Sequence, residues 1–355
     1  MTLTRGWCRW QAVAPSWTPP RKQAPSHARE VAFIGGTTST PHPPAAPAYS
    51  EEMHDNRDEI RDFLISRRAR ITPQQAGLAP GSRRRVPGLR REEVAVLAGV
   101  STDWYIRLEK GHISGVSEDV LNAVARALQL DEAECAHLFD LARAAGTGPR
   151  TRPVRRPAAT VRPGLQRMLD AMSDAPAIIR NGRMDILAAN RLGRAMYRPV
   201  YDGAPKPAGQ AGTGPGTRPA NIARFQFLDP AGPGFFPDWD TAADITVALL
   251  RTEAGRDPYN KDLTDLIGEL STRSDDFRTR WAAHNVRLHH AGTKTFHHPA
   301  IGDLTLDYES IDLHADLGLN LTVYTAAPDT PSHDALRLLA SWAATPDAHR
   351  SGGRR

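Results

Sequence analysis

The sequence contains little cysteine and no long apolar run. Only Cys8 and Cys135 occur among 355 residues, which excludes a disulfide scaffold and a zinc site built from cysteines. No stretch of about 18 apolar residues is present that could cross a membrane. The first residues also lack the apolar core of a signal peptide, and thiols this sparse are typical of a reducing compartment, so we expect a cytoplasmic protein.

Aromatic residues are scarce too. They make up 6% of the chain, and all hydrophobic residues together 40%, which indicates that part of the chain does not pack into a core. Residues 1–52 hold proline clusters and no helical or strand period, so we expect a disordered N-terminal extension. Met53 opens a helical pattern directly and is a candidate natural start of translation. We expect residues 346–355 to be a disordered tail.

Positive charge is concentrated in one region. The chain carries a formal net charge of +5, and the stretch 63–91 contains eight arginines and no acid. Residues 161–345 carry 19 Lys and Arg against 22 Asp and Glu, a balance of −3. Such a cluster is often only a solvated surface, but it is also what binding to nucleic acid requires. The eight are Arg67, Arg68, Arg70, Arg83, Arg84, Arg85, Arg90 and Arg91.

Two short helices joined by a tight turn are predicted within a helical domain over 53–145. Gly99 suits the left-handed conformation that ends a helix over 91–98, and Ser101 is a natural N-cap for a helix that runs to Lys110. Apolar residues at 100, 105 and 108 would pack inward and hold the second helix out from the surface. This order is typical of a helix-turn-helix, whose second helix enters the major groove of DNA.

The exposed start of that second helix is expected to read base edges, and arginines before the first helix are expected to contact phosphates. Asp103 could cap its helix or accept from a cytosine amine, and Trp104 could contact DNA or cover the edge of the fold. Glu109 is expected to be structural. The predicted base-reading set is Ser101, Thr102, Asp103, Trp104 and Arg107. Predicted phosphate contacts are Arg90 and Arg91, with Arg83, Arg84 and Arg85 as further candidates.

A basic, proline-rich linker over 146–160 leads to a second domain over 161–345, in which helical and strand patterns are mixed. A mobile loop is expected at the Gly/Pro-rich stretch 202–219. Helices are predicted over 163–173, 188–197, 238–255, 261–272 and 275–284, and strands over 176–180, 183–188, 286–297, 302–313 and 319–325.

Particular segments of both domains resemble known families. Residues 91–111, followed by a helix over 120–130, resemble the lambda-repressor-like XRE helix-turn-helix family across about 57–145. More narrowly, 86–93 and 105–109 are similar to the MmyB-like regulators, and the resemblance spans about 56–341. In the second domain it rests on 183–190, 229–230, 237–239, 281–284, 292–294, 298–299 and 306–309.

The resemblance implies an all-α, five-helix DNA-binding domain joined to an α+β, PAS-like ligand-binding domain. It also implies a transcription regulator with a fatty-acid-like ligand. One position departs from the family. Where XRE proteins commonly place a Gln, this chain has Arg91, which can bind phosphate but cannot supply Gln-mediated base reading.

Aromatic residues of the second domain could line an apolar ligand cavity or simply form its core. Five histidines between 284 and 298 suggest a metal site. However, 289–290 and 297–298 are adjacent pairs, and neighbours on a strand point to opposite faces. We therefore expect no metal, no cofactor and no catalysis. The predicted ligand pocket consists of Phe225, Phe227, Trp239, Trp281, His284, Phe296 and Tyr308.

These features predict a sequence-specific DNA-binding transcription regulator, not an enzyme, whose C-terminal domain senses a small, lipid-like molecule. The predicted partners are double-stranded DNA, the ligand and a second copy of the chain, since one short recognition helix discriminates weakly; half-sites would then lie roughly 34 Å apart. Two alternatives remain open: a metal-dependent enzyme with an accessory DNA-binding head, and a ligand-independent adaptor bound to DNA.

Overall fold

A computed structural model describes residues 49–79, 84, 86–146, 161–204, 218–287 and 290–344, with side chains from Asn56 onward. The chain divides into two units, Met1–Pro47 and Ala48–Arg355, and every element below belongs to the second. The expectations for most of the N-terminal extension, for 147–160, for 205–217 and for the C-terminal tail concern residues outside this description.

The N-terminal part of the second unit is helical. Its core is built from the apolar stripe of the first helix, where Ile60, Phe63 and Leu64 are fully buried, together with Tyr105 and Leu108. Each such side chain contributes about 1.5–3 kcal/mol when removed from water. The helices are α1 (Tyr49–Arg70), α2 (Arg91–Ala98), α3 (Thr102–Glu109), α4 (Glu118–Ala127) and α5 (Glu132–Gly146).

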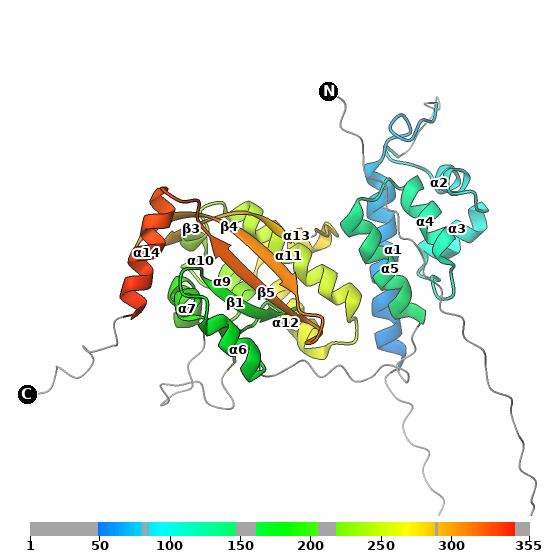
Figure 1. Ribbon diagram of the computed structural model, residues 1–355. Helices are drawn as coiled ribbons and strands as arrows, with labels where there is room; N and C mark the ends of the chain where they lie inside the picture. The colour runs from blue at the N-terminus through cyan, green and yellow to red at the C-terminus, as the bar shows by residue number, and fades with distance from the viewer. Residues whose placement is uncertain are drawn as a thin grey trace, which may run out of the picture. The chain divides into compact units, whose positions relative to one another are not determined.

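The C-terminal part contains a five-stranded sheet in its described residues (Figure 1). The strand order is β2-β1-β5-β4-β3, and each neighbouring pair is antiparallel. The first and last strands in sequence therefore pair at the centre, with Ile179 opposite Leu321. The strands are β1 (Ala177–Asn181), β2 (Ile186–Ala189), β3 (Ala291–His298), β4 (Gly302–Asp312) and β5 (Leu319–Thr325).

Helices cover the inner face of this sheet, which we define as the face that carries Ile178, Leu306, Phe296 and Tyr324. In the view of Figure 1, α9, α11 and α12 lie behind the sheet. The helices of the domain are α6 (Pro163–Asp170), α7 (Arg191–Met196), α8 (Arg198–Asp202), α9 (Ile222–Leu228), α10 (Gly232–Phe235), α11 (Trp239–Arg256), α12 (Lys261–Arg273), α13 (Asp275–Ala282) and α14 (Pro331–Ala344).

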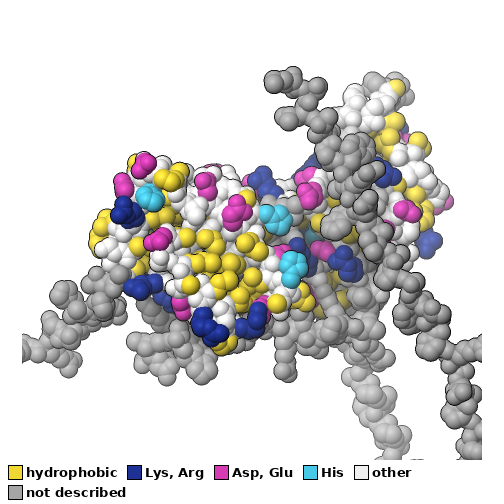
Figure 2. Space-filling view, in the orientation of Figure 1, with side chains coloured by type: hydrophobic (Ala, Val, Ile, Leu, Met, Phe, Trp, Pro, Cys, Tyr) yellow, Lys and Arg dark blue, Asp and Glu magenta, His cyan; other side chains and the backbone are white. Residues whose placement is uncertain are grey.

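The outer face of the sheet is only partly covered. Leu169 of α6 packs there against Ile179 and Leu321. On β4, side chains that point to this outer face are exposed, and they alternate with buried side chains that point to the inner face. Figure 2 shows hydrophobic side chains gathered over the sheet on the side turned toward the viewer. Ile311 and Leu317, which are 53% and 66% exposed, are among the large hydrophobic side chains that stay in water.

Three differences from the predicted elements have physical causes. Helix α1 begins at Tyr49, so 49–52, expected to be disordered, extend the helix that the buried Ile60 and Phe63 anchor. Strand β3 begins at Ala291 instead of 286, because Val286 is buried among the N-terminal helices and cannot also pair in the sheet. The stretch 188–197 starts as strand β2 and becomes helix only after Asn190, whose side chain caps α7.

Within the described residues, no helix is both long and apolar enough to cross a membrane.

Candidate functional site

The turn between α2 and α3 is held by two local devices. Gly99 ends α2 in the left-handed region, with φ at +67°, where a side chain would be strained. The hydroxyl of Ser101 then accepts a hydrogen bond from the backbone N–H of Trp104 at 3.2 Å and so caps α3. Both devices were predicted, and the short turn between two helices that they define is the helix-turn-helix geometry.

The first turn of α3 faces water. Ser101, Thr102, Asp103 and Arg107 are exposed. Tyr105 and Leu108, on the side of α3 that faces the core, are fully buried. The buried pair fixes the helix to the core, so the exposed side chains project from a rigid support. The predicted base-reading set therefore lies together on one accessible surface, except for Trp104.

Trp104 and Asp103 were assigned two roles each. The indole of Trp104 is half-buried against the core of the N-terminal helices, which favours its covering the edge of the fold. Asp103 lies in the first turn of α3, where a negative charge suits the helix dipole. The capping hydrogen bond itself comes from Ser101 and not from Asp103.

Arg91 is tied to the fold more closely than predicted. Its guanidinium pairs with Glu109, which also accepts a 2.7 Å hydrogen bond from Arg68 of α1. Glu109 is only 1% exposed, so its expected structural role is confirmed: it joins α1, α2 and α3. The side chain of Arg91 remains 50% exposed, which leaves part of its guanidinium open to an anion.

Arg84 is occupied by an internal ion pair. It donates two hydrogen bonds to Glu93, at 2.6 and 2.9 Å, and a third to the carbonyl of Gly88. The carboxylate of Glu93 also accepts from the backbone N–H of Arg90, at the start of α2. Hydrogen bonding to Arg84 lowers the pKa of Glu93 to about 2. Arg84 and Glu93 therefore form an ion pair that holds the start of α2, and we call this pair the clasp. The other two candidate phosphate contacts, Arg83 and Arg85, lie outside the described residues.

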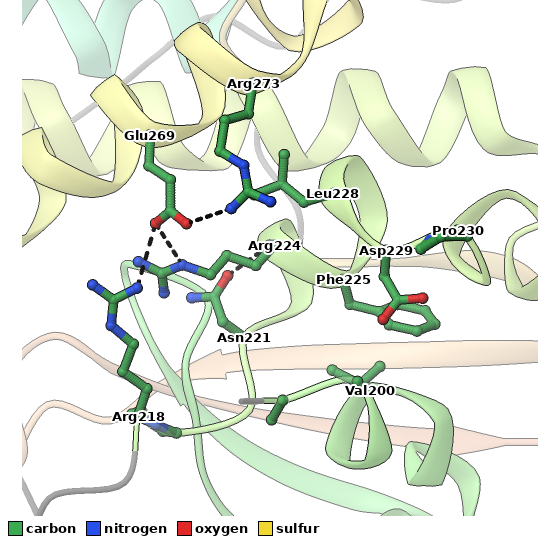
Figure 3. A pocket seen from close by; sticks show the side chains of 13 residues that line it. Val200, Arg218, Asn221, Arg224, Phe225, Leu228, Asp229, Pro230, Glu269 and Arg273 are labelled. Atoms are coloured by element: carbon green, nitrogen blue, oxygen red, sulfur yellow. Dashed lines mark hydrogen bonds and ion pairs between the residues drawn. The ribbon is translucent and has the colours of Figure 1, made fainter. Parts of the chain in front are cut away.

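A cavity of about 190 Å³ opens in the C-terminal domain beside α9 (Figure 3). Figure 3 shows three arginines meeting at Glu269, with nitrogen–oxygen distances of 2.8 Å from Arg224, 3.1 Å from Arg273 and 3.6 Å from Arg218. Val200, Phe225 and Leu228 supply apolar wall. The cavity thus combines a cationic side with a hydrophobic one.

The predicted pocket residues do not line one cavity together. Phe225 lines the cavity beside α9. Phe296 and Tyr308 lie on the inner face of the sheet, in an aromatic cluster where the hydroxyls of Tyr197 and Tyr324 are 2.5 Å apart. Phe227 and Trp239 pack edge to face beside Phe277, with ring centroids 5.7 Å apart. Trp281 stacks on Phe277, with ring centroids 5.7 Å apart, and through its other contacts meets His284 in a polar cluster.

Trp281 and His284 belong to a polar cluster that joins the C-terminal domain to α1. Its centre is Arg251 of α11, which is fully buried. The guanidinium lies 4.0 Å from the centroid of the Trp281 ring and donates to the carbonyl of that residue. It also pairs with Glu59 of α1 and lies 2.9 Å from Nδ1 of His284. His284 has φ of +52°, a strained value for a non-glycine residue.

Glu59 receives partners from both parts of the second unit. Burial would raise the pKa of Glu59, but the imidazoles of His137 and His284, each 3.6 Å away, and the charge of Arg251 outweigh burial and hold it well below the usual value. Arg67 adds a second link, since it pairs with Glu134 of α5 at 2.9 Å and donates to the carbonyl of His284. The cluster therefore links α1 and α5 to α11 and α13.

Sequence reasoning missed this cluster, although one signal was available. Arg251 lies four and eight residues after Val247 and Ala243, on the stripe of α11 that is buried. An arginine inside an apolar helical stripe indicates a buried partner of opposite charge. The partner itself, 192 positions away in α1, could not be identified from spacing.

The histidines of β3 point apart. His297 is exposed and its Nδ1 lies 2.5 Å from Asp303, whereas His298 is 3% exposed and its Nε2 lies 3.2 Å from the carbonyl oxygen of Ala195. In the described parts of the chain, no three His, Cys, Asp or Glu side chains are grouped so that they could hold a metal ion.

Comparison with known proteins agrees with this arrangement. Residues 161–339 match the model of the MmyB-like transcription regulator ligand binding domain, which is half of the chain. Residues 66–138 match a helix-turn-helix domain, and this range contains α2 and α3. No curated protein sequence matches the chain. The chain therefore belongs to the MmyB-like transcription regulators: it is a DNA-binding regulator with a separate ligand-binding domain.

Proposed function

We propose that this regulator binds a specific operator sequence as a homodimer and that its PAS-like C-terminal domain senses a small, lipid-like molecule. It acts in the cytoplasm through binding and not through catalysis. One observation carries the DNA-binding half: the first turn of α3 is exposed and is braced from behind by the buried Tyr105 and Leu108. Such a helix enters the major groove with its N-terminal residues against base edges.

The contacts divide into two kinds. Thr102 and Arg107 would read bases, and their exposure on α3 supports this role. Arg90 and the open part of Arg91, at the N-terminus of α2, would hold phosphates, because a helix N-terminus and a guanidinium both favour an anion. Two copies would span half-sites roughly 34 Å apart, about one turn of DNA.

The lipid-like ligand is supported by the chemistry of the cavity beside α9. An apolar wall that includes Phe225 and a cationic wall that includes Arg218 suit a molecule with an apolar body and an acidic head. Native mass spectrometry of the purified chain would show a co-purifying lipid if the proposal holds.

Selection of bound DNA from a random pool tests the operator proposal. Once a consensus is known, Arg107→Ala is expected to cost about 1–3 kcal/mol on the operator and to relax preference at one position. Arg126→Ala is the matched control, because Arg126 is equally exposed but lies on α4. It should change operator affinity less than threefold. If Arg107→Ala lowers the affinity for operator and for random DNA equally, Arg107 does not read bases. Absence of any salt-sensitive affinity for duplex DNA would overturn the whole proposal.

A further inference from the structure

Arg180 of β1 is a buried cation without a partner. The residue is 8% exposed on the inner face of the sheet, and in the described part of the chain no hydrogen bond or ion pair reaches its guanidinium. Burial lowers the pKa of Arg180. The other deeply buried arginines differ, since Arg251 pairs with Glu59 and Arg67 with Glu134. A buried charge left unpaired is costly, so its retention at Arg180 calls for an external counter-ion.

Arg180 borders a cavity of about 430 Å³ between β1, β5 and α11. This volume lies within the roughly 300–1,000 Å³ typical of small-molecule sites. Thr252 and Asn320 add hydrogen-bonding groups, and Leu249 and Leu319 add apolar wall. The site is distinct from the cavity beside α9, where the arginines already share Glu269.

Three acids line this cavity, Asp140, Glu253 and Asp312, and two of them pair with Arg256, which lines it as well. Arg256 lies 3.5 Å from Asp140 of α5 and 3.7 Å from Asp312 of β4. Asp312 also accepts a hydrogen bond from Asn320. Arg287, exposed at the same cavity, forms no ion pair within the described residues. Arg180 and Arg287 therefore form no ion pair within the described residues, although the charges of Asp312 and Glu253 partly offset the burial of Arg180.

A second, half-buried cation, Lys294 of β3, lies on the same face of the sheet. Nζ of Lys294 is 5.3 Å from the ring centroid of Phe236 and 5.7 Å from that of Phe296, and no acid pairs with it among the described residues. Burial, together with the charge of Arg180, lowers the pKa of Lys294 to about 8. The two cations therefore repel one another, and one anion near Arg180 would relieve both.

We propose that Arg180 is the centre of an effector site for a small organic oxyanion, a carboxylate or a phosphate, separate from any lipid-like ligand. Arginine suits this role because its planar fork holds two oxygens of such a group at once. Asp140 and Arg143 of α5 also line the cavity, so the proposed site lies beside the DNA-binding part of the chain.

Titration calorimetry of the full chain with succinate and with inorganic phosphate tests the site, each against sodium chloride at equal ionic strength. We expect at least one of the two to bind and to raise the unfolding temperature, and the stronger binder identifies the anion class. Arg180→Met should weaken binding at least tenfold. Arg278→Met is the control, since it removes the same charge from an exposed pair on α13 and should change affinity less than twofold.

Two further measurements distinguish an anion site from a structural arginine. Without anion, Arg180→Met should unfold at the same temperature as the wild type or higher, because it removes an unpaired buried charge. The chain has five lysines, so isotope-labelled dimethyl-lysine signals are resolvable, and saturation with anion should raise the pKa of Lys294. Lack of binding by both probes, unchanged affinity in Arg180→Met, or a lowered unfolding temperature would overturn the site. A chain that still binds its operator in that case would leave the regulator function intact.

Discussion

At the scale of single residues, the chain pairs arginines with carboxylates that also hold a helix in place. Glu93 accepts from Arg84 and from the first turn of its own helix. Glu109 joins three helices through Arg68 and Arg91. These pairs explain why an arginine-rich stretch is not simply a free positive surface. Only the guanidinium nitrogens that are not paired with these carboxylates remain open to a phosphate.

Gly99 gives a residue-scale prediction about the turn. Gly99→Ala should destabilise the chain by about 1–2 kcal/mol, because a side chain is strained at its φ of +67° although no atom blocks it. Gly268→Ala is the matched control in an exposed, open position of α12, and should stabilise by about 0.5–1 kcal/mol. Urea unfolding measures both. Effects of the same sign would contradict the assignment of strain to Gly99.

Glu93 gives a prediction about pH. Its pKa of about 2 should be observed by carboxyl carbon NMR, and Arg84→Met should return it toward the ordinary value of 4.5. The folded-state pKa is depressed, so the clasp stabilises α2 fully above about pH 4.5 and loses this contribution as the pH falls through 2. Arg278→Met should leave the titration unchanged. A Glu93 pKa near 4.5 in the wild type would show that the clasp is absent in solution.

At the scale of elements, α5 and α11 approach closely because Gly255 has no side chain. A Cβ at Gly255 would lie 2.5 Å from Cε1 of His137, whose ring is buried on α5. The same ring stands edge-on to Phe63 of α1, with centroids 5.0 Å apart. One glycine thus permits the packing of three helices.

Gly255→Ala should therefore destabilise the chain by about 1–3 kcal/mol through overpacking. Gly164→Ala, on the exposed surface of α6, has nothing closer than 3.9 Å and should be nearly neutral. Combined with His137→Ala, which removes the ring, Gly255→Ala should cost less than it does alone. Unfolding by urea gives all four values. Additivity of the two changes would show that His137 is not what limits the space at Gly255.

The elements also show which parts of the structure a sequence can predict. Helices α2 and α3 were predicted from caps and a terminal glycine, signals that lie within a few residues. Helix α9 was missed because it has only seven residues and its N-cap, Asn221, is positioned by a hydrogen bond to Asp185, 36 residues away. Helix α14 was missed although Pro331 at its start and the spacing of Leu336 and Leu339 were visible signals.

The candidate site divides in the same way. That Thr102 and Arg107 would be exposed followed from the period of α3. That Arg91 would be held by Glu109 did not, since the two are 18 residues apart and meet only when α2 and α3 pack. The unpaired state of Arg180 is a property of the finished fold and has no signal in the sequence. Local geometry was predictable, and long-range pairing of charge was not.

At the scale of the whole molecule, the polar cluster around Arg251 connects the DNA-binding and ligand-binding parts of the chain. Its carboxylate, Glu59, comes from α1, and its cation comes from α11, which also packs in the core of the ligand-binding domain through Val247 and Leu250. Any ligand-dependent shift of α11 must therefore move or break this pair. Its strength is the quantity on which communication between the two parts depends.

A double-mutant cycle measures that strength. Glu59→Gln should destabilise the chain by about 3–5 kcal/mol, because it leaves the fully buried Arg251 without its carboxylate. Glu59→Gln with Arg251→Met should cost less than the sum of the single changes, since the double variant buries no uncompensated charge. Asp58→Asn, one residue away, breaks only the exposed pair with Arg61 and should change little.

The same variants separate stability from communication. None of them alters an exposed residue of α3, so under conditions where each is fully folded a change in operator affinity can arise only through the placement of the DNA-binding part. We expect Glu59→Gln to change operator affinity and Asp58→Asn not to, in a titration of labelled operator at fixed salt. Equal affinities for the wild type and Glu59→Gln, with additive costs in the cycle, would show that the Arg251 cluster is only an anchor and that ligand signals pass elsewhere.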